Sequence, residues 1–266
     1  MIKKLLICYH FTKFDKVSQL NNFIKKYRKY PPGVSHKLII CFKLIPKNKV
    51  VNLRKRLSKI KYIEFIDPSL VNDFDFGSYK RVAQIYPDYY IMFLNSHSYP
   101  VASYWLKKLL KNFKVKTIIG TSASCESLTS SIKIKKIYKI FTFLFKKIKY
   151  SINFKSFPNP HIRTSSFLIK GKDFLNFALN RKFSNKEETW IAESGKNSLT
   201  SYFKSKNFNI YVVNSAGMKF TESDWHKSET YCYYNFSKSL ISDKHIRKYD
   251  DLTISEKRKS QKKVWG

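Results

Sequence analysis

The sequence lacks several features that would assign it to a class of protein directly. Its four cysteines lie far apart and form no CxxC pair; they are Cys8, Cys41, Cys125 and Cys232. This spacing argues against a zinc site and against a disulfide framework, and it favours a reducing compartment. Cys8 and Cys41 lie inside apolar runs, so we expect both to be small core residues.

Long apolar runs are also missing. No stretch reaches the roughly eighteen uninterrupted apolar residues that a membrane-spanning helix needs. The apolar run near the N-terminus is short, and no small-residue cleavage site follows it, so we expect no signal peptide. These observations predict a cytoplasmic protein, with a peripheral position at the inner face of the membrane as the alternative to a freely diffusing one.

Acidic residues are scarce, with 18 Asp and Glu against 52 Lys and Arg, which gives a net charge of +34. Only eight of the basic residues are arginine, and this bias is typical of AT-rich codons. Proteins that read nucleic acids favour arginine for bidentate contacts, so we expect no nucleic-acid partner. A basic surface still favours anionic partners such as nucleotide diphosphates and acidic lipid headgroups.

The sequence does contain enough apolar residues for one large core, since 43% of its 266 residues are hydrophobic. Short apolar runs alternate with amphipathic stretches up to about residue 120. The expected strands are 4–9, 37–44, 62–66, 89–94 and 117–120, with helices between them, one of them at 77–85. This order predicts an α/β fold with a mainly parallel sheet and helices on both faces. Ligands of such sheets bind beyond the carboxyl ends of the strands, where the strand order reverses.

The second half of the chain has a more mixed pattern. Residues 132–150 form a basic amphipathic stretch, with Lys135, Lys139, Thr142, Lys146 and Lys149 opposite Ile137, Ile140, Phe141, Leu144 and Ile148. This pattern suits a helix that lies flat on an anionic membrane, or else an ordinary helix packed on the sheet. Further on we expect a strand within 161–170, a helix over about 187–206, a strand at 210–214 and a helix from 254.

Three polar clusters are candidates for chemistry. The first, 67–79, contains Asp75, Gly77 and Ser78 between a strand and a helix. A carboxylate there can accept hydrogen bonds from sugar hydroxyls, and amides at the helix start can meet a phosphate. The alternative is a helix N-cap with solvated acids.

The second cluster, 95–98, is a row of short polar residues directly after the most apolar expected strand; on its own it is also compatible with a polar turn. In the third cluster, Glu193 precedes Ser194 and Gly195. A glutamate at this position could act as a general base beside a sugar acceptor. It is equally compatible with a helix surface.

The order of landmarks resembles that of glycosyltransferase family 2 proteins of the GT-A fold, of the kind found in bacterial surface-polysaccharide clusters. The landmarks are Asp75-Phe76-Gly77, the strand end FLNSHSYP at 93–100, Trp105-Leu106, the RTSSFLI segment at 163–169, Glu193-Ser194-Gly195 and Asn207-Phe208. The resemblance implies transfer of a sugar from a nucleotide-sugar donor to a surface-glycan or lipid-linked acceptor. It also implies one GT-A domain, with a nucleotide-sugar-binding half (1–130), a basic amphipathic insertion (131–157), and an acceptor-binding half with a C-terminal wrap (158–266).

The resemblance also implies roles for single residues. Donor contacts would come from Asp75, Gly77, Ser78, Asn95, Ser96, His97 and Ser98. Glu193 would be the catalytic base. Acceptor contacts would come from Arg163, Thr164, Ser194, Gly195 and Trp225, with Trp225 stacking on a sugar.

The chain departs from the family pattern at two points. Asn95-Ser96-His97-Ser98 replaces the Asp-x-Asp carboxylates that hold Mn²⁺ or Mg²⁺, and Ser194 replaces the second acid of the Glu-Asp motif. Divalent cations of this kind prefer charged oxygen ligands, so we expect metal-independent transfer, with His97 as the remaining candidate metal ligand. The rival hypothesis is a catalytically inactive GT-A-fold protein that binds carbohydrate or nucleotide.

Overall fold

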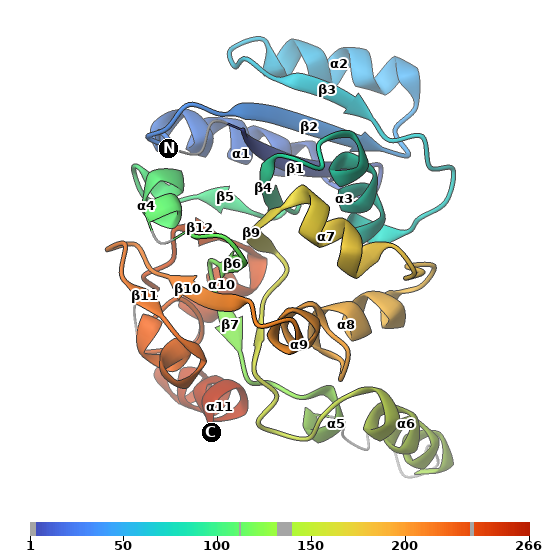
Figure 1. The fold of residues 1–266 in the computed structure, drawn as a ribbon, viewed down its shortest axis with the longest axis vertical. Helices are drawn as coiled ribbons and strands as arrows, with labels where there is room; N and C mark the ends of the chain where they lie inside the picture. Colours follow the sequence, from blue (N-terminus) through green and yellow to red (C-terminus); the bar gives the residue numbers. More distant parts are fainter. Residues whose placement is uncertain (1–3, 112, 132–139, 235–236) are drawn as a thin grey trace.

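The computed structural model describes residues 4–111, 113–131, 140–234 and 237–266. Its centre is an eight-stranded sheet in the order β11-β10-β6-β9-β4-β1-β2-β3 (Figure 1). The strands are β1 (Leu5–Thr12), β2 (Lys37–Lys43), β3 (Ile63–Ile66), β4 (Tyr90–Leu94), β6 (Thr117–Gly120), β9 (Ser166–Lys170), β10 (Asn209–Val213) and β11 (Lys219–Phe220). β9 is antiparallel to both of its neighbours and β11 is antiparallel to β10, while the remaining strands share one direction. The prediction of a mainly parallel α/β sheet is confirmed.

Strand β1 shows why helices must cover both faces of the sheet. Its side chains alternate between two separate cores, with Leu6 and Cys8 in one and Leu5 and Ile7 in the other. An unbroken apolar run of this kind is buried on both sides. Cys41 lies in the same core as Cys8, and both are completely buried as predicted.

Helices pack on both faces, as the alternation along β1 requires. On one face lie α1 (Val17–Lys29), α2 (Lys47–Leu57) and α4 (Trp105–Lys111). On the other lie α3 (Phe74–Ile85), α7 (Gly171–Ala178), α8 (Lys186–Ser194), α9 (Leu199–Ser205) and the 3-10 helix η2 (Glu222–Ser228). Each helix contributes an apolar stripe to the core beneath it.

Two helix boundaries differ from the prediction. The helix expected from Gly77 already begins at Phe74. The single helix expected over 187–206 is two helices, α8 and α9, because Gly195 leaves the helical conformation (φ −70°, ψ 173°). A Cβ atom at Gly195 would lie 2.6 Å from the Ile191 carbonyl oxygen, and the hydroxyl of Ser198 accepts from an amide of the next helix. This local chemistry outweighs the helical period.

The strand order reverses between β1 and β4, because β1 pairs with β2 on one side and with β4 on the other. Two small strand pairs bring later parts of the chain to this region. They are β5 (Tyr99–Pro100) with β12 (Ile241–Ser242), and β7 (Ala123–Ser124) with β8 (His161–Ile162). The remaining helices are α5 (Leu128–Ser131), α6 (Ile140–Asn153), α10 (Lys244–Asp250) and α11 (Ile254–Trp265). The reversal point is therefore surrounded by chain segments from both halves of the sequence.

Candidate functional site

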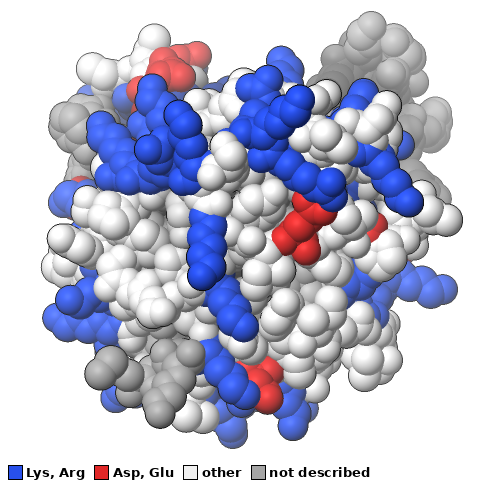
Figure 2. Space-filling model, turned by 90° about the horizontal axis from the view of Figure 1, so that it is seen from above, with Lys and Arg blue, Asp and Glu red and all other residues white. Residues whose placement is uncertain are grey.

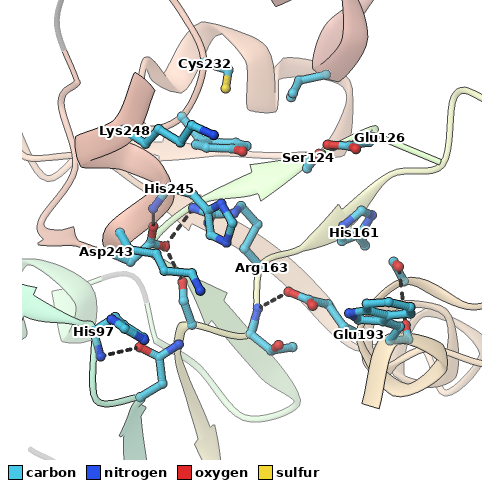
Figure 3. A pocket seen from close by; sticks show the side chains of 18 of the residues that line it. His97, Ser124, Glu126, His161, Arg163, Glu193, Cys232, Asp243, His245 and Lys248 are labelled. Carbon is cyan, nitrogen blue, oxygen red and sulfur yellow. Dashed lines mark hydrogen bonds and ion pairs between the residues drawn. The ribbon is translucent and has the colours of Figure 1, made fainter. Parts of the chain in front are cut away.

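A cavity of about 600 Å³ lies beyond the carboxyl end of β4. Asn95 and His97 enter it from the end of β4, Asp75 from the start of α3, and Glu193 from α8. Figure 3 shows Glu193 and His161 on one side of this cavity and His245 and Lys248 on the other. The polar tip of β4 and the Glu193 carboxylate thus line one space, as an α/β sheet of this order permits.

Two carboxylates lie within electrostatic reach of each other in the cavity. Glu193 is half-buried, and its Oε1 accepts a hydrogen bond of 3.1 Å from the backbone amide of Thr164. Burial, and next the negative charge of Glu193, raise the pKa of Asp75 to about 6. A carboxyl group with a pKa near neutrality can exchange a proton during a reaction.

The polar turn after β4 is mostly satisfied by its own hydrogen bonds. The Asn95 side-chain oxygen accepts from the His97 amide at 3.1 Å and from the Ser98 hydroxyl at 2.8 Å. Ser96 donates to Asp15 at 2.6 Å, and both serines are buried behind the cavity wall. Of the four residues predicted here, only Asn95 and His97 line the cavity.

His97 is held in place by its neighbours. Its ring contacts the side-chain amide of Gln19 at 2.5 Å, and its carbonyl accepts from Arg247 at 3.1 Å. Burial, and then the positive charge of Lys244, lower the pKa of His97 below its usual value. Both effects favour the neutral form of the imidazole.

The opposite wall is built around a buried ion pair. Arg163 contacts Asp243 at 2.8 Å, and the Ser165 hydroxyl donates to the same carboxylate at 2.7 Å. Burial opposes ionisation of Asp243, but Arg163 and these hydrogen bonds outweigh it and hold the pKa of Asp243 well below its usual range. The guanidinium of Arg163 also stacks on the Tyr231 ring, with 3.9 Å to the ring centre. Arg163 therefore lines the cavity as a charge already neutralised by a partner.

Lysines supply the positive charge of the cavity. Lys244 and Lys248 line it from α10, one helical turn apart, and Lys186 lines it from the start of α8. Lys263 lines it too but contacts Glu126 at 2.5 Å. Cations in a concave site concentrate the local field and favour an anionic ligand.

The predicted acceptor residues fall into two groups. Thr164 and Ser194 line the cavity together with Arg163, whereas Gly195 ends α8 outside it. The predicted stacking of Trp225 on a sugar is wrong, because its ring is completely buried in the core under η2.

The first cluster is divided in the same way. Asp75 lines the cavity, but Gly77 lies within α3 and Ser78 is completely buried. Ser78 contacts Asp67 and lies 3.1 Å from His10, and a Cβ atom at Gly77 would collide with a neighbouring carboxylate. The prediction of donor contacts from Gly77 and Ser78 is therefore wrong, since Ser78 is completely buried and the Gly77 amide donates to the Asp73 carbonyl at 3.1 Å.

The sequence did not predict the part of the cavity wall that comes from the C-terminal region of the chain. Asp243, Lys244, His245 and Lys248 come from a polar stretch with no recognisable motif. The one available signal was local, because Asp243 precedes α10 and accepts hydrogen bonds from two of its first amides, as an N-cap residue does. That signal predicts a helix start and not a cavity wall.

The donor set at the β4 tip does not fit a divalent cation. The Asn95 oxygen is occupied by the turn, and Ser96 and Ser98 are buried. Within the described ranges, no group of three or more His, Cys, Asp or Glu side chains is placed to hold a metal ion. His97 therefore lacks the oxygen ligands that Mn²⁺ or Mg²⁺ would need beside it.

Comparisons with known proteins give structural likeness only. No family model matches the chain, and no curated protein sequence matches it significantly. One similar solved structure is the galactosyltransferase LgtC in complex with donor and acceptor sugar analogues, at 13% identity and a TM-score of 0.42, over 79% of this chain and 74% of LgtC. The glycosyltransferase GlyE of Streptococcus pneumoniae is 11% identical with a TM-score of 0.43, over 78% of this chain and 44% of GlyE. The bifunctional glycosyltransferase WbbM is 11% identical with a TM-score of 0.41, over 99% of this chain and 45% of WbbM. Likeness at this level does not establish a family.

Proposed function

We propose that this chain is a glycosyltransferase that moves a sugar from a nucleotide-sugar donor to a surface-glycan or lipid-linked acceptor. The observation that supports it best is the shared cavity of Asp75, Asn95, His97 and Glu193 at the point where the strand order reverses. Its lysine-lined wall suits a diphosphate, and its carboxylates suit sugar hydroxyls.

In the proposed reaction, an acceptor hydroxyl attacks the anomeric carbon of the donor. The bond between that carbon and the phosphate oxygen breaks, and the hydroxyl proton passes to Glu193. The hydrogen bond from the Thr164 amide orients one oxygen of Glu193, which leaves the position of the carboxylate well defined. Thr164 and Ser194 lie beside it and would contact the acceptor.

The leaving group is a nucleoside diphosphate, which takes the electron pair of the broken bond. Lys244 and Lys248 on α10 and Lys186 on α8 are the cations that would neutralise it. His97 and the Asn95 amide would donate or accept hydrogen bonds on the donor. Electrostatic stabilisation by preorganised cations is an effective way to assist departure of a diphosphate.

The second candidate is a protein of the same fold that binds a nucleotide or carbohydrate without transferring it. This hypothesis is favoured by the two departures from the family pattern: the Asp-x-Asp carboxylates are missing, and Ser194 replaces the second acid of the Glu-Asp motif. The first candidate and a nucleotide-binding form of the second both predict donor binding. Only the first predicts a glycosylated product.

A thermal-shift screen with UDP-, GDP-, CMP- and dTDP-sugars tests the proposal. A ligand that binds the folded state alone raises the melting temperature with concentration. We expect one class of nucleotide sugar to do so, and mass spectrometry should then detect sugar transfer to an acceptor glycan. Binding without transfer would favour the inactive candidate, and no shift with any nucleotide sugar would contradict the glycosyltransferase and a nucleotide-binding form of the second candidate.

A further inference from the structure

The apolar stripe of α6 faces away from the protein. The exposed fractions of the residues in the stripe run from 46% for Leu144 to 82% for Phe141. The residues are Phe141, Leu144, Phe145, Ile148 and Ile152. Their spacing places them on one side of the helix. A surface helix normally buries such a stripe in the core, so α6 is turned the opposite way.

Contacts on the other side of α6 fix this orientation. The Thr129 hydroxyl donates to the Tyr150 carbonyl at 3.1 Å, and the Tyr150 ring lies edge-on to Phe154 with centroids 5.5 Å apart. Phe154 is 1% exposed and pairs with Gly195 after α8. Turning the stripe inward would expose Phe154 and break these contacts.

The charges of α6 suit a negatively charged surface. The helix contains Lys146, Lys147 and Lys149 and no acidic residue. All three lysines are exposed; Lys149 borders the apolar stripe, and Lys146 and Lys147 lie farther round the helix on its two sides. Lysines that flank an apolar face can reach phosphate groups while the apolar side chains enter the headgroup boundary.

The segment 132–139, which precedes α6, lies outside the described residues. It contains the predicted positions Lys135, Ile137 and Lys139, and the side chain of Ile140 is not described either. Among the described parts of the chain, no helix is long and apolar enough to cross a bilayer. The alternative of an α6 packed on the sheet is wrong, because α6 lies beside α5 at the edge of the molecule, away from the sheet (Figure 1).

We propose that α6 docks flat on an anionic phospholipid surface through this apolar stripe. A second copy of the chain is a poorer occupant, because pairing two α6 helices would bring their lysines together without any acidic partner on either helix. Anionic lipid complements both the stripe and the lysines, and the excess of basic residues over the whole chain acts in the same direction. Figure 2 views the molecule from the α2 end, opposite α6, and there too basic side chains spread widely while acidic ones form only small groups, so the basic excess is not confined to α6.

The docking helix is connected to the cavity through α8. Lys149 contacts Glu187 at 2.9 Å, and Lys196 donates from its amide to Asn153 and from its ammonium group to Ser151, both at 2.8 Å. Glu193 lies on the same helix α8 as Glu187. Docking would therefore hold the cavity near the membrane surface, which fits a lipid-linked acceptor; this last step rests on the proposed glycosyl transfer.

Co-sedimentation with vesicles tests the docking. We expect the wild-type chain to pellet with phosphatidylglycerol–phosphatidylcholine vesicles and to remain in the supernatant with phosphatidylcholine alone. The double variant Phe141→Ser, Phe145→Ser should lose at least about ten-fold in partitioning, because two large apolar side chains no longer enter the bilayer. Lys146→Glu, Lys147→Glu should lose binding to a similar extent, and added salt should weaken wild-type binding.

Leu70→Ser, Val71→Ser is the matched control, since these side chains are 91% and 66% exposed on the loop after β3. It should pellet like the wild type. Unchanged binding of the α6 variants, equal binding to neutral vesicles or no binding at all would overturn the proposal. So would a dimer in light scattering that the Phe141, Phe145 variant dissociates. Thermal shifts with nucleotide sugars, measured without vesicles, report the proposed catalytic function separately.

Discussion

The acids that precede α3, Asp67 and Asp73, and the acid Glu193 on α8 lie in similar polar clusters of the sequence, yet their surroundings in the structure differ. Around Asp67 the cluster is closed: Arg81 contacts both Asp67 and Asp73, and Lys43, which is completely buried, contacts Asp73. Around Glu193 the cluster is open, because the carboxylate faces a cavity. Acids whose hydrogen bonds are satisfied by cations of the protein stabilise the fold, whereas acids that face a cavity are available to a ligand.

The largest expected effect comes from removing the open carboxylate. Glu193→Gln should lower the rate of transfer about 100- to 10,000-fold, because the amide cannot accept the acceptor proton. Stability should change little, since Gln can still accept the hydrogen bond from the Thr164 amide. Transfer assays and urea denaturation measure the two effects.

Glu187→Gln is the control on the same helix, because Glu187 contacts Lys149 of α6 and does not line the cavity that Glu193 faces. It should leave the rate of transfer unchanged. Equal turnover of Glu193→Gln and the wild type would remove Glu193 from the proposed mechanism.

The next effect concerns the ion pair in the cavity wall. Arg163→Met should reduce the free energy of unfolding by about 3 to 5 kcal/mol, because it leaves the Asp243 charge buried without its partner. Urea denaturation at pH 7 measures this loss. The double variant Arg163→Met, Asp243→Asn should recover part of it; a single variant as stable as the wild type would show that the pair does not stabilise the wall.

A smaller loss of stability is expected in the closed cluster. Arg81→Met should cost about 1 to 3 kcal/mol, since Asp67 keeps its hydrogen bonds from the Ser78 hydroxyl and the Ser69 amide, and Lys43 still neutralises Asp73. Affinity for a nucleotide sugar should stay the same, because Arg81 does not line the cavity. A loss of affinity with unchanged stability would mean that the closed cluster takes part in binding.

Asp75→Asn should make the fold more stable at neutral pH. The pKa of Asp75 is about 6 in the folded chain, above the value of 3.8 for an ordinary Asp. The Asp75 carboxyl therefore stays protonated to a higher pH in the folded state than in the unfolded state. As a result, the contribution of Asp75 to the free energy of unfolding falls as pH rises from about 4 through about 6. We expect a gain on the order of 1 to 3 kcal/mol at pH 7.5 and almost none at pH 4. Urea midpoints at the two pH values decide this; a gain of equal size at both would show that ionisation is not its cause.

The smallest expected effect is that of a chelator. Transfer should continue in EDTA, since the side chains at the β4 tip offer no carboxylate for a divalent cation. Loss of activity in EDTA that Mn²⁺ restores would contradict this prediction.

Much of the sheet could be predicted because apolar periodicity is local. The run at 117–120 is β6 without any change of boundary, and the run at 4–9 corresponds to β1, which begins one residue later and ends three residues later, at Thr12. The break at Gly195 was missed because a helical period continues on both sides of it. Trp225 was assigned to a sugar because the resemblance implied a stacking aromatic at this position, and only the packing of η2 on the core shows that its ring is buried.

The sequence by itself determined the alternation of strands and helices, the mainly parallel sheet, the excess of basic charge and the amphipathic character of α6, because each depends on residue type and short spacing. Tertiary structure alone decided which carboxylates form ion pairs with Arg81 and Lys43, and which side of α6 faces solvent. It also decided that Asp243 and Lys248 lie across one cavity from Glu193. These outcomes depend on contacts between residues far apart in the chain, and no local pattern encodes such contacts.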